Sequence, residues 1–115
     1  ALKIIKNFKK NIIVEKPTFL RSSHFNDIEK QATIENVKIF PVFQNRHNYA
    51  VQRVKKAIEF KELGDLSLVS VRVRWCRPQR YFDQASWRGK WFSDGGALTN
   101  QGIHFIDVAR YLWRR

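Results

Sequence analysis

Two short stretches of the chain carry residue types suited to proton transfer and ligand binding. In the first, Glu15-Lys16-Pro17 follows the apolar run Ile12-Ile13-Val14, which is typical of a buried parallel strand. Ligands of open α/β sheets bind at the carboxyl edge of the strands, and a residue before proline avoids right-handed helical geometry. We therefore predict that Lys16 points into a ligand crevice. A strand-ending turn with solvated charges is the alternative interpretation of this tripeptide taken alone.

The second stretch runs from Gly95-Gly96 to Asp107. If the chain is helical from Thr99 onward, Asn100 and His104 lie on one face and Asp107 follows one turn later. Histidine is the side chain best suited to proton transfer near neutral pH, which makes His104 a candidate base. The alternative is a histidine packed at a helix start. His104 and Asp107 alone do not complete a metal site, so we predict no metal.

The elements that must position these residues begin with a parallel unit. The apolar residues Ala1, Ile4, Ile5 and Phe8 have helical spacing, and a strand follows at residues 12–14. Ser22 or Ser23 can cap a second helix, whose inward residues would be Phe25, Ile28 and Ala32. A second strand is predicted over residues 37–44, at a sheet edge because of Pro41. Residues 1–44 thus form a βαβ unit with a preceding helix.

The pattern changes after residue 44. The polar joint Asn45-Arg46-His47-Asn48 precedes a helix over residues 49–63, with Val51, Val54 and Ile58 inward and Gly64 as its C-cap. Val69, Val71, Val73 and Trp75 alternate with polar residues through Cys76, which predicts an antiparallel strand with one covered face. An aromatic and basic loop region covers residues 77–94, and a last helix begins near Leu98. Residues 45–115 therefore read as an α+β domain.

Composition narrows the class of protein. The 115 residues include 43% hydrophobic residues, enough for a packed core, and 22 basic against 10 acidic residues give a net charge of +12. This charge suits anionic partners or simply a soluble basic surface. The single cysteine, Cys76, excludes an intramolecular disulfide and fits a reducing, cytoplasmic compartment. No apolar run has the length of a membrane span, and we expect no membrane partner. Both ends fall inside helical patterns, so we expect a fragment.

Taken together, these motifs resemble the Gfo/Idh/MocA oxidoreductases, the superfamily of glucose–fructose oxidoreductase and inositol dehydrogenase. The resemblance covers nearly the whole chain. The residues that carry it are Val14-Glu15-Lys16-Pro17, Gln44-Asn45-Arg46-His47-Asn48, Gly95-Gly96, Gly102-Ile103-His104 and Asp107. Within the family, residues 71–78, 87–89 and 99–102 look most like the dehydrogenases of UDP-N-acetylated aminosugar uronates.

The resemblance implies a fold and an activity. Residues 1–44 would be the C-terminal part of a Rossmann domain, and residues 45–115 the start of an α+β substrate domain with an antiparallel sheet. The parent protein would be a homo-oligomer that uses NAD or NADP to oxidise a secondary hydroxyl of a sugar or nucleotide-sugar. The family's Gly-rich G-x-G-x-x-G turn, which binds the pyrophosphate, is not found in this sequence, so the isolated chain is expected to be inactive.

The resemblance also implies roles for individual residues. Lys16 and His104 would be catalytic. Many relatives carry Asp four residues before the histidine, and Asn100 stands there in this chain, so it can hydrogen-bond a sugar but accept no proton. The residues expected to bind the cofactor are Glu15, Lys16, Pro17, Asn45 and Arg46. Those expected to bind the substrate are Arg72, Arg74, Trp87, Arg88, Thr99, Asn100 and Gln101.

Two other functions fit parts of the sequence. Trp75, Tyr81, Phe82, Trp87 and Trp91 are interleaved with arginines, a pattern usable for stacking on nucleic-acid bases without catalysis. The dispersal of the basic residues along the chain weakens this interpretation, and we expect no nucleic-acid partner. A structural protein that pairs through an open sheet edge is the second alternative.

Overall fold

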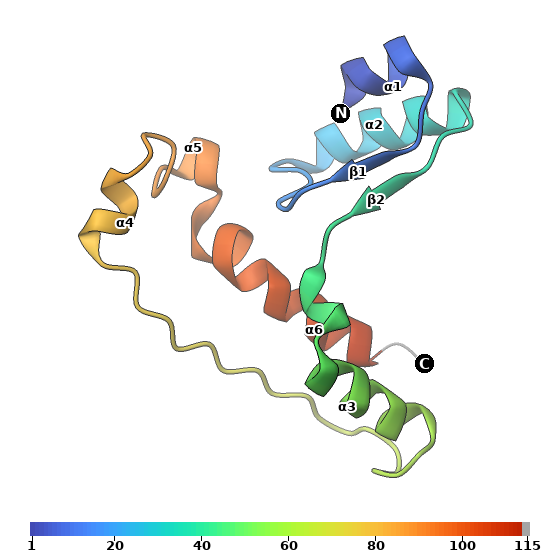
Figure 1. The fold of residues 1–115 in the computed structure, drawn as a ribbon, viewed down its shortest axis with the longest axis vertical. Coiled ribbons are helices and arrows are strands. Elements are labelled where there is room, and N and C mark those ends of the chain that lie inside the picture. Colours follow the sequence, from blue (N-terminus) through green and yellow to red (C-terminus); the bar gives the residue numbers. More distant parts are fainter. Residues whose placement is uncertain (114–115) are drawn as a thin grey trace. The chain divides into compact units, whose positions relative to one another are not determined.

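The computed structural model describes residues 1–113, which form two compact units (Figure 1). The first unit is Ala1–Val42 and the second begins at Phe43. Each unit has its own helices, and the two β-strands of the described residues belong to the first.

The first unit is a parallel βαβ unit with a preceding helix, as the sequence predicts, but its second strand is shorter than the expected range of residues 37–44. Its elements are α1 (Leu2–Phe8), β1 (Ile12–Val14), α2 (Ser22–Ile34) and β2 (Ile39–Pro41). The strands pair in parallel, with Ile12 opposite Ile39 and Val14 opposite Pro41. Because α2 connects two parallel neighbours, the carboxyl ends of β1 and β2 lie at the same edge of the sheet.

The core of the first unit is small and aliphatic. Its buried residues come from both helices, from β1 and from the segment before β2: Ile5, Ile12, Ile28, Ala32 and Val37. Three other residues expected inside are not buried: Ile4 is 47% exposed, Phe8 66% and Phe25 44%. The helix α1 is short and buries only Ile5 fully, and the Phe25 ring instead meets Phe19 edge-on, with centroids 5.5 Å apart.

The start of α2 also differs from the expected capping. Arg21 is the N-cap residue and makes no side-chain capping bond, while Ser22 is already the first helical residue. The helix is therefore held by the packing of Ile28 and Ala32 rather than by a serine cap.

The second unit is helical. Its elements are the 3₁₀ turn η1 (Gln44–His47), α3 (Tyr49–Glu59), α4 (Gln79–Asp83), α5 (Trp91–Asp94), the π turn η2 (Leu98–Gly102) and α6 (Ile103–Trp113). The side chain of Asn48 caps α3 by accepting a 3.0 Å hydrogen bond from the Ala50 amide. The helix α6 packs against α3 and η1 (Figure 1).

The helix α3 ends earlier than the apolar pattern suggests, and of the residues expected inward, Val51 and Ile58 are partly buried while Val54 is exposed. Its C-cap is Phe60, while Gly64 lies in the following turn with φ +70°. Lys55 and Ala57 are buried and Val54 is 41% exposed. Lys55 tolerates burial because its ammonium lies 5.4 Å from the Tyr111 ring centroid and 3.5 Å from a Glu59 carboxylate oxygen.

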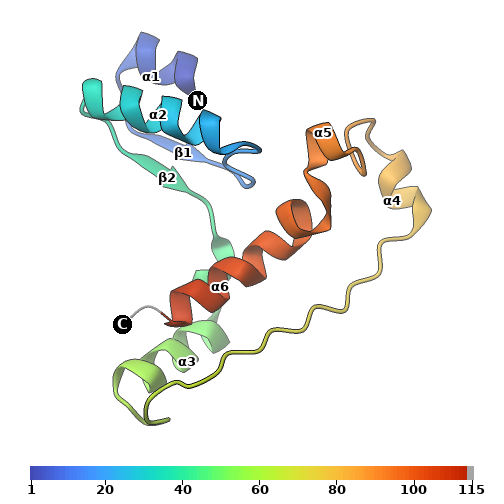
Figure 2. The ribbon, with the colours of Figure 1, turned by 180° about the vertical axis from the view of Figure 1, so that it is seen from behind.

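The antiparallel strand expected over residues 69–76 is absent from the described part of the chain. Residues 66–78 run as an extended segment (Figure 2). An isolated strand cannot satisfy its backbone groups by pairing, and within residues 1–113 no second strand pairs with it. Its alternating apolar residues remain half exposed, Val71 at 46%, Val73 at 42% and Trp75 at 53%.

Candidate functional site

The carboxyl edge of the two-stranded sheet carries Glu15-Lys16-Pro17. Lys16 and Pro17 are partly buried, and the Lys16 amide donates a 3.2 Å hydrogen bond to Glu15 Oε2. Pairing continues beyond β2, because the Val42 amide donates to the Val14 carbonyl at 2.9 Å. The next residue, Thr18, has a buried hydroxyl oxygen that makes no hydrogen bond within residues 1–113. This edge therefore carries several polar groups, and one of them, the Thr18 hydroxyl, has no hydrogen-bond partner among the described residues.

The segment from Gly95 to Trp113 carries the second candidate set. Gly95 and Gly96 have φ of +72° and +79°, in the region that favours glycine. A Cβ at Gly95 would lie 2.7 Å from Thr99 Cγ2, and one at Gly96 would lie 2.9 Å from Trp91 Cζ3. The two glycines thus allow a tight turn before the long helix, in which Gly95 lies close to Thr99 and Gly96 lies close to Trp91.

The long helix begins with a π turn, and its polar residues face inward. Asn100, in η2, and His104, in the first turn of α6, are each only 7% exposed. Thr99 and Gln101 flank Asn100 and are partly buried. Buried polar side chains without a packing role are unusual, and π turns within α-helices are frequent at functional sites. The arrangement provides an imidazole and a carboxamide on consecutive turns of one helix.

Asp107, one turn after His104, holds Arg46. Arg46 Nε and Nη2 donate to the two Asp107 carboxylate oxygens at 2.7 and 2.5 Å. The guanidinium carbon also lies 5.4 Å from the ring centroids of Phe43 and Tyr111. The hydrogen bond and the charge of Asp107 raise the pKa of Arg46 above its ordinary value, against the opposing effect of burial.

This ion pair joins η1 to α6 across 61 positions of sequence. Gln52 of α3 strengthens the junction, since its side-chain amide donates to the Arg46 carbonyl and, at 3.2 Å, to the Tyr111 hydroxyl. The neighbouring Asn45 is partly buried, and its carbonyl accepts a 3.1 Å hydrogen bond from the Asn48 amide. The Nε–Nη2 edge of the Arg46 guanidinium is thus engaged by Asp107, and binding of the cofactor by Asn45 and Arg46 stays a prediction.

The remaining residues expected to bind substrate fall in two places. Arg72 and Arg74 are exposed on the extended segment. Trp87 and Arg88 lie in the loop between α4 and α5, where Arg88 Nη1 donates at 2.9 Å to the Tyr81 carbonyl and to Gln84 Oε1. The structure thus gathers Thr99, Asn100, Gln101 and His104 on one helix and leaves Arg72 and Arg74 on a separate segment.

Sequence reasoning missed the partners that fix these loops. Asp94 is buried, and its Oδ2 accepts a 2.6 Å hydrogen bond from the Gly89 amide. Ser93 Oγ donates to the Trp87 carbonyl at 2.7 Å. A signal was present in the sequence, because Ser-Asp directly before two glycines is typical of a side-chain-stabilised turn.

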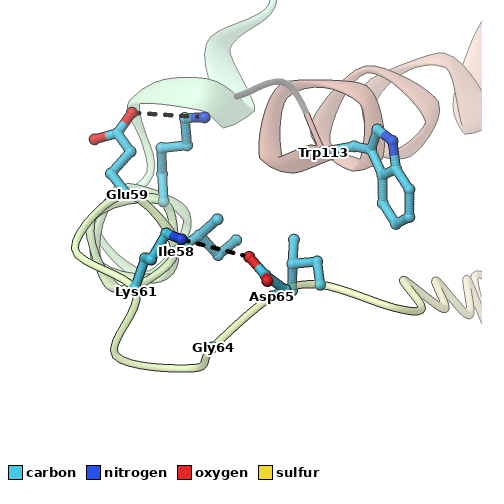
Figure 3. A pocket seen from close by; sticks show the side chains of 8 residues that line it. Ile58, Glu59, Lys61, Gly64, Asp65 and Trp113 are labelled. Atoms are coloured by element: carbon cyan, nitrogen blue, oxygen red, sulfur yellow. Dashed lines mark ion pairs between the residues drawn. The ribbon is translucent and has the colours of Figure 1, made fainter.

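The second unit also contains a cavity of about 520 Å³. It is lined by the end of α3, the turn that follows and Trp113, and contains the ion pairs Lys55–Glu59 and Lys61–Asp65 (Figure 3). None of the predicted site residues lines it. Its charged groups are already paired with one another, so it offers little reactive chemistry.

Two further classes of site are not found among the described residues. Residues 1–113 contain no group of three His, Cys, Asp or Glu side chains placed to hold a metal ion. No helix in this part of the chain combines the length and apolar character needed to cross a membrane.

Comparison with known proteins points to one family. Residues 51–115 match the family model described as the GFO/IDH/MocA C-terminal domain. The structure is similar to the WlbA dehydrogenase from Bordetella pertussis in complex with NADH and UDP-GlcNAcA, with a TM-score of 0.89 and 40% identity over 96% of this chain and 32% of that one. The WlbA dehydrogenase from Chromobacterium violaceum, also in complex with NADH and UDP-GlcNAcA, has a TM-score of 0.82 and 39% identity over 89% of this chain and 30% of that one.

A more distant structure shares the fold. A putative myo-inositol dehydrogenase from Sinorhizobium meliloti is 23% identical, with a TM-score of 0.68, over 97% of this chain and 33% of that one. No curated protein matches the chain. The chain thus spans about a third of the length of the solved structures that it matches.

Proposed function

Because the chain belongs to the GFO/IDH/MocA family, we propose that it forms part of an NAD-dependent dehydrogenase acting on a UDP-linked sugar uronate. The reaction is the oxidation of a secondary hydroxyl to a ketone. The observation that carries the proposal is the buried pair Asn100 and His104 on the helix that follows the π turn. The likeness to two dehydrogenases that bind NADH and UDP-GlcNAcA supports the choice of cofactor and substrate.

The first unit is proposed to bind the nicotinamide end of the cofactor. The parallel strands β1 and β2 present their carboxyl ends at one edge, where α/β sheets bind nucleotides. The buried Thr18 hydroxyl, which has no hydrogen-bond partner within residues 1–113, is the kind of group that a ligand would satisfy. Glu15, Lys16 and Pro17 would hold the cofactor there. A nicotinamide cofactor held by these residues would supply the acceptor for the hydride of the carbinol carbon.

Three residues of this chain are proposed to act at the substrate hydroxyl and its neighbours. An imidazole nitrogen of His104 takes the hydroxyl proton as the carbonyl forms. From the family resemblance, the Lys16 ammonium would stabilise negative charge that develops at the reacting hydroxyl. The Asn100 carboxamide hydrogen-bonds a neighbouring sugar group and fixes its orientation, but takes no proton.

Other residues of the second unit would bind the rest of the substrate. Thr99 and Gln101 flank Asn100 and would contact the sugar. Trp87 and Arg88, together with Arg72 and Arg74, would contact the nucleotide part, for which planar guanidinium groups and aromatic rings are suited. We further propose that the enzyme is a homo-oligomer and that it is cytoplasmic, the latter in keeping with the lone free Cys76.

A chimera tests the proposed function. Residues 1–115 replace the matching segment of the Bordetella pertussis WlbA dehydrogenase, which supplies the remaining two thirds of the enzyme. NADH formation is then measured with UDP-GlcNAcA as substrate. We expect turnover in the chimera, and a loss on the order of 10²–10⁴-fold when His104→Asn removes the base.

The controls separate catalysis from folding. The His104→Asn chimera should bind NADH and unfold like its parent, because asparagine keeps hydrogen-bonding ability without a titratable nitrogen. A folded, NADH-binding chimera that forms no NADH from UDP-GlcNAcA would contradict the proposed substrate. A His104→Asn variant that keeps its rate would contradict the proposed base.

A further inference from the structure

Five side chains of residues 75–88 form an alternating arrangement of aromatic rings and guanidinium groups, here called the cation–aromatic stack. The guanidinium carbon of Arg77 lies 3.8 Å from the Trp75 ring centroid and 4.8 Å from that of Tyr81. The guanidinium carbon of Arg88 lies 4.3 Å from the Tyr81 centroid and 5.4 Å from that of Trp87. Tyr81 thus contacts both cations, and a tryptophan flanks each of them.

Neighbouring elements hold the stack in place. Tyr81 lies in α4, and its carbonyl accepts a hydrogen bond from Arg88. Gly89, next to Arg88, packs so closely that an added Cβ would lie 3.1 Å from the Phe82 ring. The Tyr81 and Phe82 rings meet edge-on, with centroids 5.3 Å apart. The arginines are therefore preorganised, which lowers the entropic cost of binding a ligand.

The hydrogen-bonding capacity of the two arginines is not used up by the protein. A guanidinium that stacks through its face keeps its N–H donors at its edge. Arg77 Nε and Arg88 Nε are both buried and make no hydrogen bond within residues 1–113. Neither side chain forms an ion pair with any of these described residues. Buried donors without a protein partner are rare in native proteins, and where they occur a bound ion or ligand can satisfy them.

The surrounding charge favours an anion. Residues 72–90 contain six basic residues and one acidic residue, Asp83. The Asp83 carboxylate accepts a 2.9 Å hydrogen bond from the side chain of Gln79. One of its oxygens is therefore engaged within α4. The residues Trp75 and Trp87 are 53% and 46% exposed, so each offers surface on which a planar base can stack.

From these observations we propose that the cation–aromatic stack binds the diphosphate group and base of a nucleoside diphosphate. The edge donors of Arg77 and Arg88 would bind the two phosphates, and the exposed face of Trp75 or Trp87 would stack on the base. The inference rests on the proposed function, since it names the part of this chain that holds the nucleotide half of the substrate. It assigns Arg77 a role in binding that the sequence analysis did not indicate. It also gives Trp75 and Tyr81, considered there only for stacking on nucleic-acid bases, a role in binding a nucleotide.

The experiment uses UDP as the probe and the chain of residues 1–115 as the protein. All four tryptophans lie in the second unit, and two of them belong to the stack, so quenching of tryptophan fluorescence follows binding. We expect saturable binding of UDP. Arg77→Gln should weaken it about tenfold or more, as the loss of a hydrogen-bonded charge at a phosphate predicts.

Two variants separate a built site from general attraction by positive charge. Arg80→Gln removes an equal charge only three residues along the chain, but Arg80 lies in α4, is exposed and is outside the stack. This control should bind UDP within about twofold of the parent, as expected for an exposed charge. Arg77→Lys keeps the charge without the planar fork and should also lose most of the affinity. It provides the test if Arg77→Gln fails to fold, as judged by circular dichroism.

Several outcomes would overturn the inference. One is an equal loss of UDP affinity in Arg77→Gln and Arg80→Gln. Another is inorganic pyrophosphate binding as tightly as UDP, which would remove the base from the site. A third is a uridine oligonucleotide binding more tightly than UDP with a steep salt dependence, which would indicate a nucleic-acid surface.

The chimera makes failure of this inference distinguishable from failure of the proposed function. If UDP binding depends on Arg77 while the chimera forms no NADH, the nucleotide site stands and the proposed reaction fails. If the chimera turns over and its Arg77→Gln variant keeps the same KM for UDP-GlcNAcA, the reaction stands and the assignment of the stack fails.

Discussion

The ion pair between Arg46 and Asp107 gives a sharp test of how the second unit is held together. Arg46→Ala removes hydrogen bonds of 2.7 and 2.5 Å and leaves a carboxylate whose side chain is 9% exposed. Removing one partner of a fully buried pair costs about 3–5 kcal/mol. Since the Arg46 side chain is 41% exposed, water can reach part of the vacated space. We therefore expect a loss of about 2–3 kcal/mol in the free energy of unfolding.

Urea unfolding followed by tryptophan fluorescence measures this loss. All tryptophans lie in the second unit, so their emission does not report on unfolding of the first. Asp107→Ala is the matched variant. It should cost less, about 1–2 kcal/mol, because the remaining Arg46 cation can turn toward water. The double variant then gives the coupling energy of the pair.

A second arginine–carboxylate pair with similar geometry provides the control. Arg53 donates to both carboxylate oxygens of Glu62 at 3.2 and 2.9 Å, but these side chains are 55% and 45% exposed. Arg53→Ala should leave the unfolding free energy unchanged within error, as is usual for exposed pairs. If Arg46→Ala lowers the free energy of unfolding no more than Arg53→Ala does, then the burial of Asp107 does not make the Arg46–Asp107 ion pair more stabilising than an exposed one.

The two pairs should also respond differently to pH. The pKa of Arg46 is raised by its hydrogen bond to Asp107, so its contribution is complete below the ordinary arginine pKa and is lost only above it. Raising the pH to about 10 should therefore leave the cost of Arg46→Ala constant. The pKa of Glu62 is lowered mainly by its hydrogen bond to Arg53. Any contribution from that pair is present above the ordinary glutamate pKa and disappears as the pH falls through the lowered value.

Three other predictions concern catalysis, backbone geometry and surface. In the chimera, Lys16→Ala should lower turnover much more than NADH affinity, and a change within a few-fold in both would reduce Lys16 to a strand-ending charge. Gly95→Ala should cost about 1–3 kcal/mol in urea unfolding because its Cβ would lie 2.7 Å from Thr99, whereas Gly64→Ala, with no atom within 4 Å, should cost less. Residues 1–115 should bind a hydrophobic dye, since side chains such as Trp91 and Phe92 are 81% and 75% exposed; a monomer that binds no dye would refute this.

The first unit could be predicted from sequence because its signals are local. The apolar run at residues 12–14 and the helical spacing of Ile28 and Ala32 lie within the elements that they specify. The expected inward position of Phe25 was wrong, because spacing shows which residues share a face but not how much of that face the rest of the unit covers. Alternation at residues 69–76 likewise indicates an extended conformation, while pairing needs a second strand that residues 1–113 do not place beside it.

The candidate site was predictable to the same local extent. Asn100 and His104 were expected on one helix face from their spacing, and both are buried on consecutive turns. The contact of Arg46 with Asp107 joins residues 61 positions apart, and no local pattern indicates such a pair. The cation–aromatic stack was not predicted for a related reason. The aromatic and basic composition of the segment was visible, but the order in which rings and guanidinium groups meet depends on the turn between α4 and α5.

The π turn at Leu98–Gly102 sets the rotation of the helix that follows it. A π turn holds one residue more than an α-helical turn, so deleting one residue from this stretch would let the helix close and rotate residues 103–113 by about 100° about their axis. His104 and Asp107 would then leave their buried positions together, and Arg46 would lose its partner. Among related sequences, the length of this turn should therefore be more constant than the residue types within it. A sequence with a single-residue gap here should also have changed the residues equivalent to Arg46 and His104.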